Sequence, residues 1–213
     1  MRALLFAGFL LLLAWLGFRF SSRDAPSRMN TAASIERTPV CPWRQPQRDL
    51  LELFPAATNY FAETRILSGA MVPIQKRLGR AMTVDENPLR IFRVHRQEQW
   101  VGSVLLCRVK GEHGGIEMVI GVETNGAVRG VLIQSQREPE PVAQAITNAA
   151  FLRSFIGKGA SSSLRVGVDL PEVMTEGRRS AQAVADGVRS QLIVLSFADQ
   201  SNEFPQSRLQ ATH

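Results

Sequence analysis

The sequence predicts an α+β fold: an antiparallel β-meander packed against helices and preceded by one N-terminal transmembrane helix. Three observations carry this prediction. Residues 3–18 are uninterruptedly apolar, residues 91–134 contain runs with the two-residue period of β-strands, and residues 181–195 place apolar side chains at helical spacing. The 213 residues are 45% hydrophobic, a share typical of globular proteins, and the length suits one domain with additional segments.

The N-terminal apolar run is expected to be a membrane anchor. It is shorter than the roughly 20 residues of an average span, a difference that flanking side chains and local thinning can absorb. Residues 17–20 (GFRF) lack the small side chains that precede a cleavage site, although the two serines that follow leave cleavage as an alternative. We therefore expect residues 1–20 to be a single span in the inner membrane, residues 21–46 to be a linker, and the bulk of the chain to lie on the periplasmic side.

The central part of the chain predicts an antiparallel meander. Its strands are joined by short turns, of which Asn125-Gly126 is the strongest hairpin signal because both residue types tolerate a positive φ. The expected pieces, in order, are a strand at 91–94, a turn at 97–99, and strands at 100–109, 116–122 and 127–134.

Helical patterns precede and follow these strands. Residues 47–54 have helical spacing that stops at the next proline, and residues 58–80 are mixed, with a helix break near Pro73. A helix from Pro139 is expected to end at Gly157, a typical C-cap residue. The remaining expected pieces are a short strand at 164–168, a long helix over 181–195 and a flexible tail at 199–213, which leaves one domain over residues 47–198.

Composition excludes several classes of function. The net charge is +6, but the arginines are scattered singly without interleaved aromatics, so we expect no nucleic-acid binding and instead a basic surface facing anionic lipids or an acidic partner. No metal-ligand spacing and no serine-nucleophile motif occur, so neither a metal site nor hydrolytic catalysis is expected. Cys41 and Cys107 are either two unrelated thiols or, in an oxidising compartment, a single bridge.

Four segments of the chain carry a resemblance to a known family. They are residues 53–57 (LFPAA), the hairpin of residues 119–131, residues 136–139 (QREP) with the Phe-x-x-x-Phe-x-Gly-Lys of residues 151–158, and residues 173–184. Together they resemble the FMN-binding domain shared by the G subunit of the Rnf electron-transport complex and the C subunit of the sodium-translocating NADH:quinone reductase. The resemblance covers residues 50 to 195.

The last of these segments resembles the family's flavin attachment signature. The family keeps Ser/Thr-Gly-Ala-Thr there, and the final Thr carries FMN through a phosphoester bond. A helix N-terminus suits a phosphate because unpaired backbone N–H groups and the positive end of the dipole face it. Aligned on the Ala-Val pair at 183 and 184, the signature becomes residues 175–178 (TEGR), so the attachment hydroxyl is missing. A register shifted by two offers Ser180.

Three interpretations of this site stay open. FMN is attached covalently through Thr175 or Ser180, or it is held non-covalently. In the second case Arg178 and Arg179 pair its phosphate as a charge-assisted fork beside Gly177. In the third interpretation these residues only cap and solvate the start of a helix.

The resemblance implies an electron relay without independent catalysis. The family's domain exchanges electrons with neighbouring membrane subunits, so this chain is expected to be an accessory or electron-relay subunit whose covalent flavin is lost and whose partners are other membrane redox subunits. The family's Glu-Thr-Pro-Gly loop lies near the isoalloxazine, which places Arg137 and Glu138 beside the ring. The alternative is a non-redox, membrane-tethered binding module that reuses the fold.

Overall fold

The computed structural model describes residues 41–200. The expected anchor at 1–20, the linker up to residue 40 and the tail from residue 201 lie outside the described residues. Within residues 41–200, no helix has the length and apolar character needed to cross a membrane.

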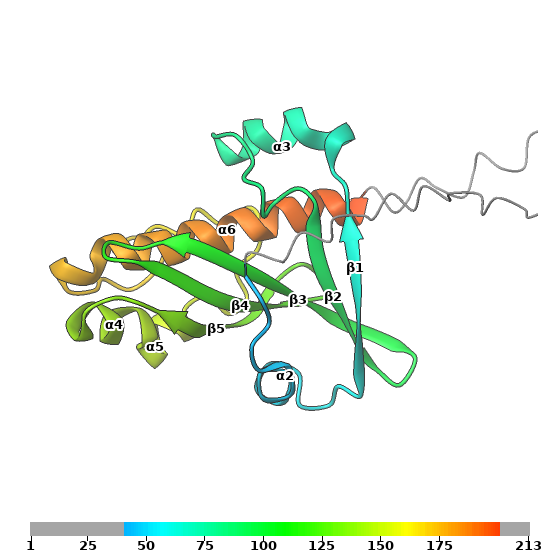
Figure 1. The fold of residues 1–213 in the computed structure, drawn as a ribbon, viewed down its shortest axis with the longest axis horizontal. Helices are drawn as coiled ribbons and strands as arrows, with labels where there is room; N and C mark the ends of the chain where they lie inside the picture. The colour runs from blue at the N-terminus through cyan, green and yellow to red at the C-terminus, as the bar shows by residue number, and fades with distance from the viewer. Residues whose placement is uncertain (1–40, 201–213) are drawn as a thin grey trace, which may run out of the picture. The chain divides into compact units, whose positions relative to one another are not determined.

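The centre of the fold is a five-stranded antiparallel sheet in the order β1-β2-β3-β4-β5, in which each strand pairs with its neighbour in sequence (Figure 1). At the β4–β5 turn, Gly126 has a positive φ of 81° and Asn125 Oδ1 accepts a hydrogen bond from Ala127 N, as the Asn-Gly signal predicts. The α+β meander is therefore confirmed. Its strands are β1 (Asn59–Arg65), β2 (Leu89–Arg96), β3 (Gln99–Lys110), β4 (Gly115–Glu123) and β5 (Val128–Gln136).

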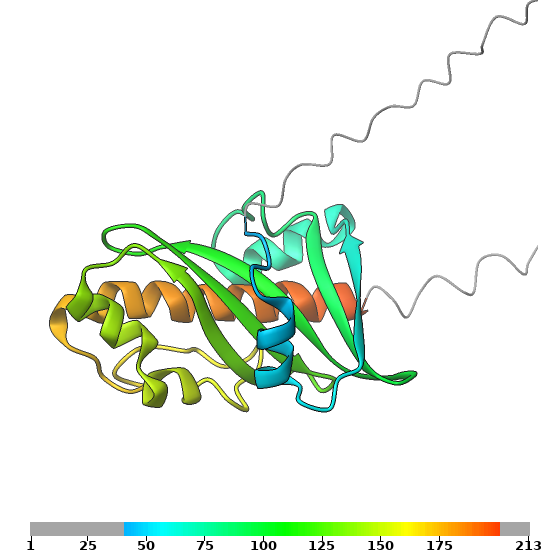
Figure 2. The same cartoon turned by 60° about the horizontal axis from the view of Figure 1, so that its bottom comes forward.

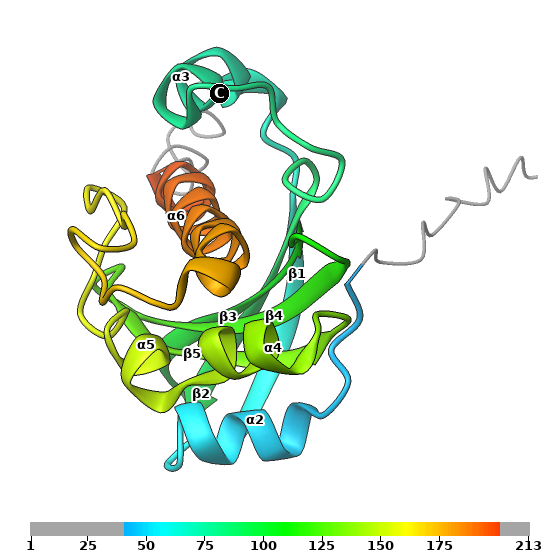
Figure 3. The same cartoon turned by 90° about the vertical axis from the view of Figure 1, so that its left-hand side faces the viewer.

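Helices cover both faces of the sheet. Helix α6 (Arg178–Gln200) lies along one face and α2 (Pro46–Leu53) packs against the other, as Figures 2 and 3 show. Because side chains alternate across a strand, β3 contributes to two cores. Leu105 faces the large core that contains the apolar side of α6, whereas Val104 faces a smaller core with Phe54.

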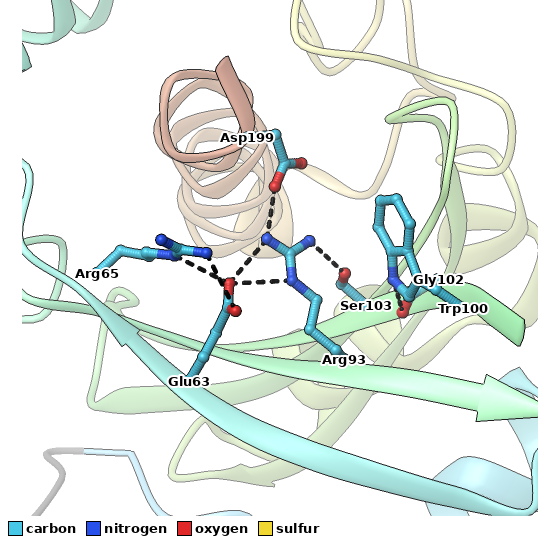
Figure 4. Close-up of polar contacts among 7 residues, drawn as sticks. All are labelled: Glu63, Arg65, Arg93, Trp100, Gly102, Ser103 and Asp199. Atoms are coloured by element: carbon cyan, nitrogen blue, oxygen red, sulfur yellow. Dashed lines mark hydrogen bonds and ion pairs between the residues drawn. The ribbon is translucent and has the colours of Figure 1, made fainter. Parts of the chain in front are cut away.

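The C-terminal end of α6 is tied to the sheet by a polar network around Arg93 (Figure 4). The Arg93 guanidinium donates to Glu63 of β1 at 2.8 Å and to Asp199 of α6 at 2.5 Å. It also donates to Ser103 Oγ at 3.0 Å and lies over the ring of Trp100. Since the Arg93 side chain is only 12% exposed, these contacts fix the helix against three strands.

Residues 58–80 are mixed, as predicted, but they contain a strand that was not predicted, and the helix break predicted near Pro73 is wrong. Strand β1 lies there unexpectedly, because as an edge strand it is mostly exposed and its sequence, NYFAETR, has no apolar alternation. Pro73 does not break a helix but lies in the first turn of α3 (Met71–Leu78). A backbone N–H in that turn has no partner within the helix, so its absence in proline leaves no hydrogen bond unmade.

The helix predicted from Pro139 to Gly157 is in fact two helices, α4 (Glu140–Thr147) and α5 (Ala149–Arg153). Asn148 separates them because its side chain accepts hydrogen bonds from two backbone N–H groups of α5, at 2.8 and 3.3 Å. Gly157 has a positive φ of 78° but lies beyond the end of α5. A side-chain N-cap therefore starts a second helix inside one continuous apolar pattern.

The strand predicted at 164–168 is also wrong, since the only pairing there is an isolated bridge between Val166 and Leu170. Leu164 and Val166 are both buried, which produces the period-two pattern of a strand. The Val166 N–H donates to the side chain of Gln182 in α6 at 3.0 Å instead of to a sheet. This segment is therefore a loop held against the helix.

Candidate functional site

A cavity of about 930 Å³ opens at the start of α6. We call it the first cavity. It lies between the first turns of α6, the end of β3 and the loop around Val166. Its lining residues are Lys110, Glu112, Arg165, Val166, Val168, Thr175, Arg178, Arg179, Gln182, Ala183 and Asp186.

Close packing beneath the cavity fixes the start of α6. The 3-10 turn η2 (Thr175–Gly177) leads into the helix, and Gly177 is buried against α4. A Cβ atom on Gly177 would lie 2.6 Å from the Cβ of Ala145, so only glycine lets the two elements approach this closely. The first turn of α6 thus belongs to a closely packed segment that continues η2, since the Arg178 N–H donates to the carbonyl oxygen of Thr175.

The first cavity has more cationic than anionic side chains. Its lining contains four cationic side chains, those of Arg165, Arg178, Arg179 and Lys110. Against these stand only two carboxylates, those of Glu112 and Asp186. Arg178 also has an ion pair of 3.5 Å with Glu172, and Arg165 has one of 3.7 Å with Asp169.

These two ion pairs do not neutralise the cationic side of the cavity. Both arginines are more than half exposed, so each pair contributes little and can be exchanged for a ligand. Among residues 41–200, Arg179 and Lys110 take part in no ion pair. The arrangement suits an anionic group with several oxygen acceptors.

The predicted site residues fall into two groups. Thr175, Arg178 and Arg179 line the first cavity. Ser180 is fully buried, and its hydroxyl accepts a hydrogen bond from the backbone N–H of Glu112 at 2.9 Å. In this conformation the Ser180 hydroxyl therefore does not face the cavity, because the helix turns it into the protein.

Glu138 is buried in the segment between β5 and α4 and does not line the first cavity. Its carboxylate accepts hydrogen bonds from His113 N at 3.2 Å, from Gly114 N at 3.4 Å and pairs with His113 Nδ1 at 3.0 Å. Burial alone would raise the pKa of Glu138, but these donors, together with Ser180, outweigh it and lower the pKa. Glu138 thus holds the β3–β4 turn against the start of α6, while its neighbour Arg137 is exposed.

A second cavity of about 320 Å³ continues along α6 and was not predicted. It shares Lys110, Ala183 and Asp186 with the first cavity. The sequence signal that marks it is a set of small and polar residues at three- and four-residue spacing in a helix otherwise rich in apolar side chains. Its other lining residues are Arg80, Thr83, Asp85, Glu86, Cys107, Arg108, Val109, Gly187, Ser190 and Gln191.

The two cysteines are both free. The Cys41 thiol donates a long hydrogen bond, 3.6 Å, to the carbonyl oxygen of Cys107. Burial raises the pKa of Cys41 to about 11 and that of Cys107 to about 12, so both are neutral thiols at physiological pH. Of the two alternatives left open by the sequence, the structure has the unbridged one.

Comparison with known proteins gives a likeness of fold. No protein-family model matches the chain, and no curated protein matches it in sequence. Its fold is similar to that of NqrC. The NqrC structure from Shewanella oneidensis is 13% identical, covers 76% of this chain and 90% of its own, and has a TM-score of 0.49.

A second similar structure comes from Parabacteroides distasonis and is the C subunit of the Na(+)-translocating NADH-quinone reductase. It is 14% identical, covers 67% of this chain and 78% of its own, and has a TM-score of 0.45. This protein is one of the two whose motifs the sequence resembles. The identities are low, so the functional argument rests on the site residues of this chain.

Proposed function

We propose that this chain is a membrane-anchored, extracytoplasmic domain that binds FMN non-covalently in the first cavity and relays electrons within a membrane redox complex. In this proposal residues 1–20 are the anchor, 21–46 the linker, 47–198 the FMN-binding domain and 199–213 the tail. The observation that carries it is the gathering of Arg178 and Arg179 with two further cations, Lys110 and Arg165, at the start of α6.

The donor set in the first cavity fits the phosphate of FMN. Guanidinium groups bind phosphate oxygens through paired, charge-assisted hydrogen bonds, and the start of a long helix adds a positive dipole end. The first cavity, of about 930 Å³, is wide and open to solvent, so a phosphate can enter it directly. When bound, FMN would supply the ring that takes up and releases electrons, and the chain supplies binding and orientation.

Attachment through Thr175 is the second candidate mode of binding. Thr175 is exposed and lines the first cavity, whereas the Ser180 hydroxyl is buried and engaged. Since the fourth signature position is Arg178, the proposal favours a non-covalent complex. Acid precipitation separates the two modes, because only a covalent flavin stays with the protein.

The proposal is tested by titrating FMN into the full chain in detergent and following flavin fluorescence. Arg179→Gln should weaken binding about tenfold, the value of one charge-assisted contact, and raised salt should weaken it further. Arg189→Gln is the matched control, because Arg189 lies on the same helix but lines neither cavity. Failure of the unmodified chain to bind FMN would overturn the proposal and support the alternative, a non-redox binding module.

A further inference from the structure

Residues 66–80 hold apolar side chains out into solvent. Ile66 and Val72 are each 78% exposed, and Met71 is also exposed. Single exposed aliphatic side chains are common on protein surfaces, as at Leu51 in α2, but three within seven residues are not. We call residues 66–80 the α3 projection, because Figures 1 and 3 show α3 on the far side of α6 from the sheet.

The α3 projection is held in place by the rest of the fold. At its base, Leu67 is buried and its backbone N–H donates to Asn87 Oδ1 at 3.0 Å. At its other end, Gly79 caps α3 with a left-handed φ of 75° and donates its N–H to the carbonyl oxygen of Gln75. Ile74 of α3 is fully buried in the large core. The exposure of the apolar side chains is therefore a feature of an ordered segment.

Helix α3 packs by one side and presents a mixed apolar and cationic side to solvent. Val72 and Lys76 are four residues apart, so they share one side of the helix, whereas Ile74 is turned by about 200° from Val72. Ile74 is buried, and both Val72 and Lys76 are exposed. A lysine at such a position keeps its ammonium in water while its alkyl stem lies along apolar surface.

The charges of the α3 projection and of the residue before it are all positive. Between Glu63 and Asp85 the chain has four cations and no carboxylate: Arg65, Lys76, Arg77 and Arg80. Arg65 pairs with Glu63 at 3.2 Å and Arg80 with Glu86 at 2.6 Å. Within the described range, Lys76 and Arg77 are exposed and take part in no ion pair. Two unpaired cations thus lie on the same short helix as the exposed apolar side chains.

We infer that the α3 projection docks on the surface of an anionic phospholipid bilayer. Its apolar side chains would enter the boundary between headgroups and acyl chains, and Lys76 and Arg77 would lie at the lipid phosphates. Buried apolar area and attraction to anionic lipids add together in amphipathic segments of this kind. A protein interface usually centres on aromatic residues, and residues 66–80 contain none, so lipid is the better match.

The proposed anchor allows this small surface to be effective. The inference rests on the proposed function here, because the anchor at residues 1–20 would hold the domain beside a bilayer. Residues 21–40 separate that anchor from the described part of the chain, and a chain of this length spans at most about 70 Å. Tethering raises the effective concentration of the domain at the lipid surface. A contact too weak to bind a membrane alone can therefore orient the domain on it.

The test follows a fluorophore on the α3 projection in the full chain reconstituted into vesicles. Ser68 is exposed between Ile66 and Val72, so Ser68→Cys is labelled there with an environment-sensitive dye. The native cysteines are buried, so the unmodified chain should take up little dye. In vesicles of phosphatidylglycerol and phosphatidylcholine, the emission should shift to the blue and be quenched by nitroxides on the lipids. Glu52→Cys, exposed on α2 at the opposite face of the sheet, is the matched reporter and should show neither change.

Substitutions beside the Ser68→Cys reporter separate the apolar and the electrostatic contribution. Lys76→Gln should lower the ratio of docked to undocked chains about fivefold, the value of one cation at an anionic surface, and raised salt should lower it further. Val72→Ser should lower it about tenfold. Arg96→Gln and Leu51→Ser are the matched controls, since both residues are exposed outside the α3 projection, and they should leave the ratio unchanged.

The outcomes separate this inference from the proposed function. If the chain floats with the vesicles while the dye at Ser68 stays unquenched, the docking is wrong and the anchor stands; a protein partner for the α3 projection is then the remaining explanation of its exposure. If the chain does not float, the anchor and the docking both fail. Equal quenching at Ser68 and Glu52, or quenching in pure phosphatidylcholine that Lys76→Gln does not change, would also overturn the inference. FMN titration in the same vesicles tests the cofactor site independently.

Discussion

Replacing Arg93 with methionine should destabilise the fold by about 2 kcal/mol at pH 7. Arg93 is the shared partner of two carboxylates, Glu63 of β1 and Asp199 of α6, at 2.8 and 2.5 Å (Figure 4). Methionine keeps much of the side-chain volume but removes both ion pairs and the hydrogen bond to Ser103. The end of α6 then loses its polar attachment to the sheet.

The magnitude follows from the exposure of the groups involved. Breaking a fully buried ion pair costs about 3–5 kcal/mol because a charge is left without a partner. Here Glu63 is 30% and Asp199 38% exposed, so both carboxylates regain water, and Glu63 keeps its contact with Arg65 at 3.2 Å. The expected cost therefore falls to about 2 kcal/mol, or roughly 4–8 °C in Tm for a domain of this size.

The cost should depend on pH through Glu63. Burial alone would raise its pKa, but hydrogen bonds from Arg65 and Arg93 outweigh burial and lower the pKa. A carboxyl whose pKa is lowered by folding adds stability above its unfolded pKa, about 4.3, and this stability is lost as the pH falls through the folded pKa. The difference between Arg93→Met and the unmodified chain should thus be full at pH 7 and shrink below about pH 4.

Thermal unfolding followed by circular dichroism at pH 7 and at pH 3 measures both effects. Arg96→Met is the matched control on the same strand, since Arg96 is exposed and bonds only to Gln99 among residues 41–200. It should change the free energy of unfolding by less than about 0.5 kcal/mol. A loss of stability with Arg93→Met that is equally large at pH 3 would refute the electrostatic explanation and point to packing against Trp100.

Three further predictions concern the start of α6 and the thiols. Glu138→Gln should destabilise the fold by about 2 kcal/mol at pH 7, because an amide accepts fewer hydrogen bonds from the β3–β4 turn than a carboxylate does. Since folding lowers the pKa of Glu138, the deficit should shrink when urea unfolding is repeated below about pH 4. Gly177→Ala should lower the free energy of unfolding by about 1–3 kcal/mol and weaken FMN binding, because the added methyl group collides with α4. Gly69→Ala, whose added methyl group meets no atom within 4 Å, is its control in thermal unfolding. Cys41 and Cys107 should resist alkylation at pH 8 in the folded chain and react on unfolding. Their pKa values of about 11 and about 12 leave little thiolate in the folded chain. Fast labelling without denaturant would contradict their burial.

The elements with a clear period could be predicted from the sequence. The β3–β4–β5 meander and α6 were predicted because each has one face in the core, which imposes a period of two or of 3.6 on the apolar residues. Strand β1 could not be, because an edge strand with little burial has no such pattern. The split between α4 and α5 depends on one side-chain cap at Asn148, which the apolar pattern does not reveal.

Of the candidate site, only the residues that line the first cavity could be placed from the sequence. Thr175, Arg178 and Arg179 could be placed at a helix start by their spacing, and the structure brings them to one cavity. What the pattern could not give was the direction of neighbouring side chains. Successive helix residues differ by about 100°, so Ser180 points into the protein although Arg179 points out.

The second cavity has a sequence signal only on its α6 side. Its other lining residues come from β3 and from the segment after α3, which the fold brings to the helix. The two cavities follow one another along α6, with an excess of cations in the first and balanced charges in the second. The site therefore depends on one helix that presents two different chemistries on a single face, and the ends of that helix are fixed by Gly177 packing at one end and by Arg93 at the other.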